Sequence, residues 1–417
     1  MTLEPRQRHR ISGGYKPQPL RGLLLLGVLL ILAWSQLQIP FAHSQIADSP
    51  KTSASSSRFS LKFQEIAPGI EYGQATTGEA SKDENSGPWF VNVLRIDPAR
   101  ATIKIVRALD AGVGMETVSS LAARHRATAA INGGYFRTTG TYRGESIGLL
   151  LLDDKLISEP HNDRAEFGLI DDGKSIEVIF GHLGYAGEVS VGRAKHKVQG
   201  LNRPVSKDEL VVFTPEFHRT TLTKPDGIEV AVRKNRVFSI ADFAGSARIP
   251  ADGYVISAVG SAREWVKRNV RKGSLVKFWW RLRPLHANED QKWRKAHNIL
   301  GAGPQLIKGG KIDITDKQEK MAAGFATDRH PRTALARLGS GKILLLTVDG
   351  RQPGVSVGMS LQRLAELLRE FDAVEAINLD GGGSTTMVVQ DRIVNRPSDQ
   401  TGERPVSDAI LVFSKPK

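Results

Sequence analysis

Residues 376–388 read Ala-Ile-Asn-Leu-Asp-Gly-Gly-Gly-Ser-Thr-Thr-Met-Val, and this stretch decides how the rest of the chain is interpreted. An apolar strand ends in Asn378 and Asp380, and three glycines then lead to three hydroxyl-bearing residues. Adjacent glycines are costly to order, so they are expected where the backbone needs a positive φ or a close approach by another group. We interpret the stretch as a ligand-binding turn at a strand end; the alternative is a hairpin or helix-entry turn that binds nothing. A nucleotide-binding loop is excluded, because the Lys of a P-loop and the GxGxxG spacing are both absent.

A similar unit occurs earlier in the chain. Residues 127–131 form a short apolar strand that runs into the sequence Asn-Gly-Gly at 132–134. Each unit is preceded by a segment with helical spacing of its apolar residues, at 117–124 and 361–371. The repeated order of helix, strand, asparagine and glycine turn suggests that the two turns face one cleft.

Composition and charge limit the class of protein. The chain has 417 residues, of which 40% are hydrophobic and 24% charged, as in an ordinary globular protein with a large core. A net charge of +14 suits anionic glycans, phosphodiesters or a membrane surface. Nucleic acid is not expected as a partner, because no helix-turn-helix, zinc-finger or RNA-reading motif is visible. The absence of cysteine excludes disulfides, thiolate metal sites and a cysteine nucleophile, and fits a bacterial envelope.

The N-terminus has the features of an export signal. Arg and Lys residues precede an apolar run at 23–34, which is shorter than the ~20 residues that span a bilayer. We predict a signal peptide over 1–44, with an uncleaved signal-anchor as the alternative and the only expected contact with a membrane. A flexible linker over 45–60 and one domain over 61–417 would follow. The protein is then expected in the periplasm or outside the cell.

Periodicity in the rest of the chain predicts an α+β fold with mixed sheets and packed helices. Helices are expected at 117–124, 262–271 and 361–371. Strands are expected at 90–96, 102–106, 127–131, 149–152, 167–170, 176–180, 209–213, 228–232, 253–258, 276–282, 343–348 and 374–379.

The set of motifs resembles the phosphodiester glycosidases. Six segments carry the resemblance in the family's order and together cover most of residues 90–413. They are Asn132-Gly133-Gly134-Tyr135-Phe136, Gly301-Ala302-Gly303-Pro304 with Leu306-Ile307, Arg332-Thr333-Ala334, Asp349-Gly350-Arg351-Gln352, Asn378 through Thr386, and Asn395-Arg396-Pro397-Ser398-Asp399. The resemblance implies an exported α+β domain, a phosphodiester glycosidase-like domain, that acts on a sugar joined through its anomeric carbon to phosphate.

Breaking such a bond develops positive charge on the sugar ring and negative charge on the departing phosphate. Phosphate is a good leaving group, so one carboxylate could carry most of the chemistry as a nucleophile or as the base for water. Asp380 is the first candidate, and Asp349, at the end of the apolar strand 343–348, is the second unless it forms an Asp-Gly turn. Glu145 could be the acid partner, with a surface-loop role as the alternative.

Binding residues are expected around these acids. Arg332, followed by Thr333, is the predicted phosphate ligand, because a planar guanidinium can pair with two oxygens at once; Arg351 is the second. Asn132 and Asn378 would orient sugar hydroxyls or the turns themselves. The other predicted contacts are the turn residues Gly133, Gly134, Gly381, Gly382, Gly383, Ser384 and Thr385.

No metal site is predicted, since the histidines lack HxH or HExxH spacing. A divalent cation could be held through Asp349, Asp380 and Asn378, although two carboxylates suffice without one. The expected function is hydrolysis of an N-acetylglucosaminyl-type sugar 1-phosphodiester in envelope glycan or exopolysaccharide metabolism. The partner would be this phosphorylated glycan. The alternatives are a non-catalytic phosphoglycan-binding protein of polysaccharide assembly and a phosphodiesterase that cuts the P–O bond.

Overall fold

The computed structural model is described for most of the chain beyond the N-terminal segment, and residues Ser57–Lys417 group into one compact unit. The described residues are 61–78, 86–110, 112–286 and 290–415. The predicted signal at 1–44 and linker at 45–60 lie outside them. None of the helices within the described ranges has the length and apolar content needed to cross a bilayer.

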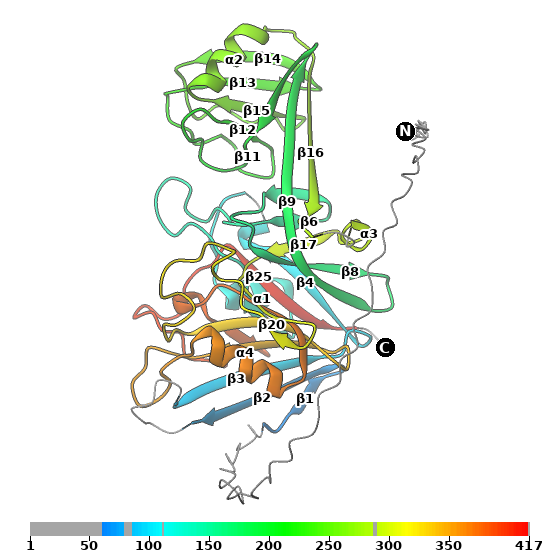
Figure 1. Cartoon of the computed structure of the whole chain (residues 1–417), viewed down its shortest axis with the longest axis vertical. Coiled ribbons are helices and arrows are strands. Elements are labelled where there is room, and N and C mark those ends of the chain that lie inside the picture. Colours follow the sequence, from blue (N-terminus) through cyan, green and yellow to red (C-terminus); the bar gives the residue numbers. More distant parts are fainter. Residues whose placement is uncertain (1–60, 79–85, 111, 287–289, 416–417) are drawn as a thin grey trace, which may run out of the picture. The chain divides into compact units, whose positions relative to one another are not determined.

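Two sheets form the body that carries the two glycine turns of the sequence (Figure 1). The eight-stranded sheet has the order β1 (Gln64–Ala67), β2 (Ile70–Thr77), β3 (Trp89–Ile96), β21 (Ile343–Val348), β20 (Arg332–Leu338), β22 (Ala373–Asn378), β18 (Gln305–Lys308) and β19 (Lys311–Ile312). The β5 sheet has the order β24 (Arg392–Ile393), β23 (Met387–Val389), β5 (Ala129–Asn132), β25 (Asp408–Ser414) and β4 (Ala101–Arg107).

Two further sheets hold the middle of the chain. The seven-stranded sheet has the order β10 (Ala194–Val198), β9 (Ile176–Val191), β8 (Ala165–Asp171), β17 (Asn298–Gly301), β6 (Leu150–Leu152) and β7 (Lys155–Ser158), and β16 (Val276–Pro284) also pairs with β9. The β13 sheet has the order β11 (Gly200–Leu201), β12 (Leu210–Phe213), β15 (Gly253–Ala258), β13 (Ile228–Arg233) and β14 (Arg236–Asp242). The helices are α1 (Val118–His125), α2 (Ser261–Asn269), α3 (Asp290–Trp293) and α4 (Leu361–Glu370), with 3-10 turns η1 (Ala108–Asp110) and η2 (Gly382–Ser384).

The eight-stranded sheet and the β5 sheet pack face to face, with a helix on each outer face. Leu345 and Ile377 from the first sheet share a core with Ile131 and Ile410 from the second. Helix α4 covers the other face of the eight-stranded sheet through residues such as Leu364. Helix α1 covers the other face of the β5 sheet. Both helices begin as predicted, because the side chains of Thr117 and Ser360 each accept a hydrogen bond from a backbone N–H of the first turn.

The fold differs from the predicted α+β class because strands outnumber helices by far. Most regular elements are strands, and every strand pair among the described residues is antiparallel except β11 with β12. Packed helices are confirmed for α1, α2 and α4, which lie on sheets. Of the predicted mixed sheets, the described strands form one, the β13 sheet, in which β11 pairs parallel with β12. The two helix–strand–turn units contribute no parallel pair. Their strands pair with distant strands in antiparallel register rather than forming parallel βαβ crossovers.

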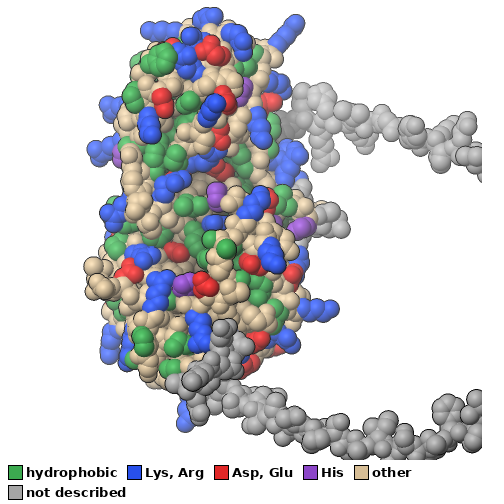
Figure 2. Space-filling model, turned by 60° about the vertical axis from the view of Figure 1, so that its left-hand side comes forward, with side chains coloured by type: hydrophobic (Ala, Val, Ile, Leu, Met, Phe, Trp, Pro, Cys, Tyr) green, Lys and Arg blue, Asp and Glu red, His purple; other side chains and the backbone are tan. Residues whose placement is uncertain are grey.

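Strand β9 is much longer than the predicted 176–180, because it continues through Gly181, Gly184 and Gly187 to Val191. These glycines hide the alternation that identifies a strand in sequence. Strand β16 pairs with β9 along its whole length, and one face of the pair packs against the β13 sheet and α2. Figure 2 shows Lys and Arg side chains spread over the face in view, in keeping with the net charge of +14.

The register of the two packed sheets brings four strand ends together. Asn132 ends β5 and pairs with Ala409 beside the start of β25. Asn378 ends β22 and pairs with Ala334 beside the start of β20. The residues that follow β5 and β22 therefore leave the two sheets at the same end of the sandwich.

Candidate active site

The two glycine turns lie side by side, as the sequence suggested. The Asn132 Nδ2 atom donates to the backbone oxygen of Asp380 at 2.7 Å. In return, the Asp380 N–H donates to the oxygen of Gly133 at 3.1 Å. These reciprocal bonds fix one turn against the other although they are far apart in the chain.

Asn132 and Thr333 are fully buried beneath the turns. The Oδ1 atom of Asn132 accepts from Thr333 Oγ1 at 2.9 Å and from the Thr386 N–H at 3.2 Å. Thr333 Oγ1 also lies 3.3 Å from Thr385 Oγ1. Of the two roles predicted for Asn132, this geometry favours the orientation of the turns over contact with sugar hydroxyls.

Asn378 belongs to a second buried network that includes a residue not selected from the sequence. Its Nδ2 atom donates to Tyr135 Oη at 2.9 Å and to the oxygen of Gly303 at 3.0 Å. Tyr135 Oη in turn donates to the Gly303 oxygen at 2.7 Å. The Oδ1 atom of Asn378 is buried and makes no hydrogen bond. Tyr135 follows the first glycine turn directly, and that position was the signal that could have identified it.

Asp380 stands where the two turns meet and is partly exposed. Its Oδ1 atom accepts from the Gly381 N–H at 2.9 Å, and Ser384 also hydrogen-bonds its side chain. Desolvation of the carboxyl group raises its pKa to about 6, against the opposing effect of these hydrogen bonds and of Arg404. A carboxylate that is open to a ligand and ionises near neutral pH is suited to nucleophilic or base catalysis.

Asp408 is a second acid that sequence reasoning missed. It is 1% exposed, and its Oδ1 atom accepts from the Gly134 N–H at 2.7 Å, while Oδ2 accepts from Ser407 Oγ at 2.6 Å. Burial raises its pKa, and its charge raises that of Asp380. An aspartate at the start of the apolar strand 409–413 was the only sequence signal. Asp408 holds the first glycine turn in place from below.

Gly133→Ala is expected to destabilise the protein. A Cβ atom at Gly133 would lie 2.0 Å from Asp408 Oδ1, and that oxygen cannot move away without losing its bond to the Gly134 N–H. The free energy of unfolding should fall by about 1–3 kcal/mol, measured by chemical denaturation. Gly114→Ala is the control, since its Cβ would meet only the exposed side chain of Leu109. Equal stability of the two variants would contradict the prediction.

Asp349 is fully buried and does not lie at an open cleft. Its Oδ1 atom accepts from Asn395 Nδ2 at 3.2 Å, and its Oδ2 atom accepts from the Arg396 N–H at 2.8 Å. Asn395 also donates to the Thr385 oxygen at 3.0 Å, so Asp349 supports the second glycine turn through Asn395. Burial raises the pKa of Asp349 to about 6. Because both carboxylate oxygens are occupied, the geometry favours a supporting role over the predicted catalytic one.

Arg332 is only 2% exposed, which contradicts the open position expected of a two-oxygen phosphate clamp. Its Nε atom donates to the Met359 oxygen at 2.9 Å, and its Nη2 atom donates to the oxygens of Phe325 and Asp328, both at 2.8 Å. Burial lowers the pKa of this guanidinium to about 10. Only Nη1 is left for a ligand, because Nη2 holds the segment 325–328 and Nε holds the backbone at Met359.

Two other arginines lie beside the second glycine turn. Arg351 is exposed, and its Nη2 atom is 3.1 Å from the point where a Cβ of Gly382 would lie. Arg404, which was not predicted, forms a two-point ion pair with Asp399 and places Nη1 3.5 Å from Ser384 Oγ. Arg351, the second of the two predicted phosphate ligands, is therefore better placed for an anionic ligand than Arg332, the first.

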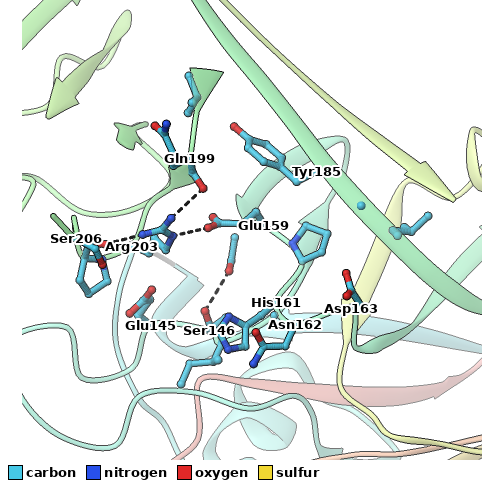
Figure 3. A pocket seen from close by; sticks show the side chains of 18 of the residues that line it. Glu145, Ser146, Glu159, His161, Asn162, Asp163, Tyr185, Gln199, Arg203 and Ser206 are labelled. Carbon is cyan, nitrogen blue, oxygen red and sulfur yellow. Dashed lines mark hydrogen bonds and ion pairs between the residues drawn. The ribbon is translucent and has the colours of Figure 1, made fainter. Parts of the chain in front are cut away.

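Glu145 lines a hollow that Asp380 does not line (Figure 3). This hollow of about 460 Å³ is lined by Glu145, Ser146, Glu159 and His161, among others, but not by Asp349, Asp380 or Arg332. Burial raises the pKa of Glu145 to about 7, although Arg137 Nε donates to its Oε2 atom at 2.6 Å. Glu145 is thus a buried acid rather than a surface-loop residue. The structure does not bring together the three predicted catalytic acids.

The hollow and the turns are nevertheless neighbours. Ser146, in the wall of the hollow, places its Oγ atom 3.5 Å from Asp408 Oδ2. The backbone N–H of Ile147 donates to the oxygen of Tyr135 at 2.7 Å. The same short segment therefore forms one wall of the hollow and supports the first glycine turn.

Comparison with known proteins gives a family match for the part of the chain that contains the second glycine turn. Residues 226–413 match the family model described as phosphodiester glycosidase. This segment resembles the phosphodiester glycosidases. Over 129 residues the chain is 37% identical to the N-acetylglucosamine-1-phosphodiester alpha-N-acetylglucosaminidase of Mus musculus, a match that covers 27% of this chain and 25% of that enzyme. The chain therefore aligns with about a quarter of the curated relative.

Solved structures show the same fold over a larger part of the chain. A protein of Burkholderia pseudomallei K96243 named as exported has a TM-score of 0.73 at 23% identity, covering 85% of this chain and 96% of that one. A hypothetical protein from Synechocystis has a TM-score of 0.71 at 23% identity, covering 85% of this chain and 64% of that one. At this identity the likeness concerns the fold alone.

The segment that matches the family model contains Asp380, Asp349, Arg332, Arg351, Arg404 and Asp408. Asn132, the first glycine turn and Glu145 precede it in the chain. The structure connects them to the segment through the bonds of Asn132 with Asp380 and of Gly134 with Asp408. The candidate site is therefore built from residues on both sides of position 226, where the matched segment begins.

The described residues contain no complete set of metal ligands. Across 61–78, 86–110, 112–286 and 290–415, no group of three or more His, Asp or Glu side chains is arranged to hold an ion. Asp349, one of the three predicted oxygen ligands, already accepts from Asn395 and Arg396. A divalent cation at Asp380 stays a prediction.

Proposed function

We propose that the protein is an exported hydrolase that cleaves a sugar 1-phosphodiester, with N-acetylglucosamine as the sugar, in envelope glycan or exopolysaccharide metabolism. The observation that carries the proposal is the position of Asp380, a partly exposed carboxylate held between two glycine turns with Arg351 beside them. The family of residues 226–413 and the name of the mouse relative support the substrate class. N-terminal sequencing of the exported protein would check cleavage after residue 44, and a start at Met1 would contradict it.

In this proposal Asp380 faces the anomeric carbon, either as the nucleophile or as the base that activates water. The bond between the anomeric carbon and the phosphate oxygen breaks, and its electron pair stays on that oxygen. Arg351, Nη1 of Arg332 and the N–H groups of the glycine turns would balance the charge that develops on the phosphate. The oxygen of water ends on the sugar, and the released product is a phosphomonoester.

The reaction can be tested with an aryl or alkyl N-acetylglucosamine 1-phosphodiester in ¹⁸O-labelled water. Label in the free sugar would support the proposal. Label in the phosphate would show a phosphodiesterase that cuts the P–O bond. Saturable binding without either product would show a non-catalytic phosphoglycan-binding protein. Each of the last two results would overturn the proposed reaction.

The rate is expected to depend on pH through Asp380. The pKa of this carboxyl is raised to about 6, and the reaction requires its ionised form, so kcat/KM should fall as the pH drops below about 6. The contribution of Asp380 to folding stability changes in the opposite direction and should rise as the pH falls below about 6. The reason is that a raised pKa in the folded state means that protonation of Asp380 stabilises the fold. The measurement is a kcat/KM profile from pH 4 to 8.

Asp349→Asn is the control for this profile, since the pKa of Asp349 is also raised to about 6. The acidic limb should remain in this variant, because Asp349 is buried away from the ligand. Loss of the acidic limb in Asp349→Asn would show that the limb reports Asp349, which would contradict the assignment to Asp380.

A further inference from the structure

Strands β10, β9 and β16 form a three-stranded ladder with one face exposed. Residues that pair across neighbouring strands project from the same face of a sheet. Lys197 pairs with Glu188, which pairs with Trp279. One step further along, Lys195 pairs with Ser190, which pairs with Lys277.

The exposed face is strongly basic. Along β16 the exposed positions alternate with half-buried ones, and the exposed residues are Lys277, Trp279, Arg281 and Arg283. Opposite Arg281 and Arg283, strand β9 presents only the small residues Ala186 and Gly184. We call this set the basic face: Lys195, Lys197, Lys277, Trp279, Arg281 and Arg283, around the floor formed by Gly184, Ala186, Glu188 and Ser190.

Only Glu188 is acidic among these residues, and it is already engaged. Its side chain lies 3.1 Å from Lys195 Nζ and accepts from Trp279 Nε1 at 3.3 Å. The second bond fixes the indole of Trp279, which is 45% exposed. The basic face therefore combines several cations with one oriented aromatic ring, and an exposed ring of this kind offers an apolar surface on which a sugar can stack.

We propose that the basic face binds an anionic glycan with phosphodiester-linked sugars, so that the substrate of the hydrolase is a polymer. Alternate residues on a strand are about 6.6–7 Å apart, so Lys277, Arg281 and Arg283 form a row of charges that can follow a chain carrying repeated phosphates. The phosphates pair with the cations, and a sugar ring lies on Trp279. The substrate class rests on the proposed function, whereas binding to the face can be measured separately.

The basic face leads toward the site. Lys197 belongs to the face and also lines the hollow of Figure 3, together with Gly184. The lining of that hollow also includes Ser146, which contacts Asp408 beneath the first glycine turn. A glycan bound along β16 and β9 can therefore continue through the hollow toward the turns.

Nucleic acid is the less suitable occupant of this surface. Binding of single strands uses several aromatic rings on which successive bases stack. Among the described residues of the basic face, Trp279 is the only exposed aromatic ring. A single aromatic ring among several cations fits a glycan, because not every sugar ring of the polymer needs an aromatic partner.

The test measures binding of the full chain, carrying Asp380→Asn to prevent turnover, to a polymer of N-acetylglucosamine 1-phosphate. The double variant Lys277→Glu with Arg281→Glu should weaken this binding about 10-fold or more at low salt, and the difference should largely disappear near 1 M salt, where the screening length is about 3 Å. Trp279→Ala should also weaken it, and this loss should persist at high salt. Lys311→Glu with Arg392→Glu is the matched control, because both residues are exposed strand positions on other sheets.

Three results would overturn the inference. They are an equal loss in the control, no loss in the variant, or tighter binding of double-stranded DNA or phosphatidylglycerol vesicles than of the polymer. Hydrolysis of a small diester by the unaltered protein separates the two proposals. Hydrolysis without polymer binding refutes only the basic face, and polymer binding without hydrolysis of any diester refutes only the proposed reaction.

Discussion

Asp380→Asn should reduce turnover of a sugar 1-phosphodiester by about 10²–10⁴-fold, the contribution expected of one positioned acid–base group. The substitution keeps the shape of the side chain and leaves Oδ1 able to accept from the Gly381 N–H, so the turn should persist. It removes the charge that would stabilise or attack the anomeric carbon. Steady-state kcat and thermal unfolding of the same preparations would show whether the loss is chemical rather than structural.

Asp349→Asn is the matched comparison, because it changes another buried aspartate close to the same turn. This variant turns one of the two accepting oxygens into an NH2 group that faces the donor of Asn395 or Arg396. Its free energy of unfolding should therefore fall by about 1–3 kcal/mol, a loss that is reduced by removing a buried carboxylate whose pKa is raised to about 6. Its effect on kcat should be much smaller than that of Asp380→Asn. A larger loss of kcat in Asp349→Asn than in Asp380→Asn would place the reacting carboxylate at Asp349.

Arg332→Ala should destabilise the protein by about 3 kcal/mol or more, because three backbone carbonyls lose their donor in a buried environment. The affected segment also carries Phe325, whose ring meets that of Tyr135 edge-on with a centroid distance of 6.3 Å. Activity should fall with stability, since Tyr135 contacts Asn378 in the site. Chemical denaturation and kcat/KM, measured on one preparation, check both effects.

Arg351→Ala provides the contrast, because its guanidinium is exposed beside Gly382. Its stability should stay within about 0.5 kcal/mol of the unaltered protein, while KM for the diester should rise. If Arg332→Ala instead kept full stability and raised only KM, then Arg332 would be the phosphate ligand that the sequence predicted.

Local signals explain what the sequence could predict. The apolar run of β21 and the capped, amphipathic α4 are visible because their period and end residues agree. The pairing of the two glycine turns was predictable from their shared order of residues. The length of β9 was not, because its glycines interrupt the alternation.

Side-chain roles were harder to predict than elements. The sequence Arg-Thr-Ala at 332–334 looks the same whether the guanidinium faces a ligand or three backbone carbonyls, and only the fold distinguishes the two. Asp408 carries no glycine or motif that marks it, yet it meets Gly134 across 274 positions of sequence. Glu145 was selected as an acid, but the hollow that it lines also depends on β9 and β10 of the seven-stranded sheet.

The reciprocal bonds between the turns have a consequence for how the chain must fold. Asn132 and the Asp380 backbone are 248 positions apart, so the site forms only after a very long loop has closed. Contacts of this range slow folding, because the entropy of closure is lost before any contact repays it. A fragment that starts at residue 226 would also lack β3 from the centre of one sheet and β5 from the other. The recognisable part of the sequence is thus not a self-sufficient folding unit, and its assembly requires the N-terminal strands.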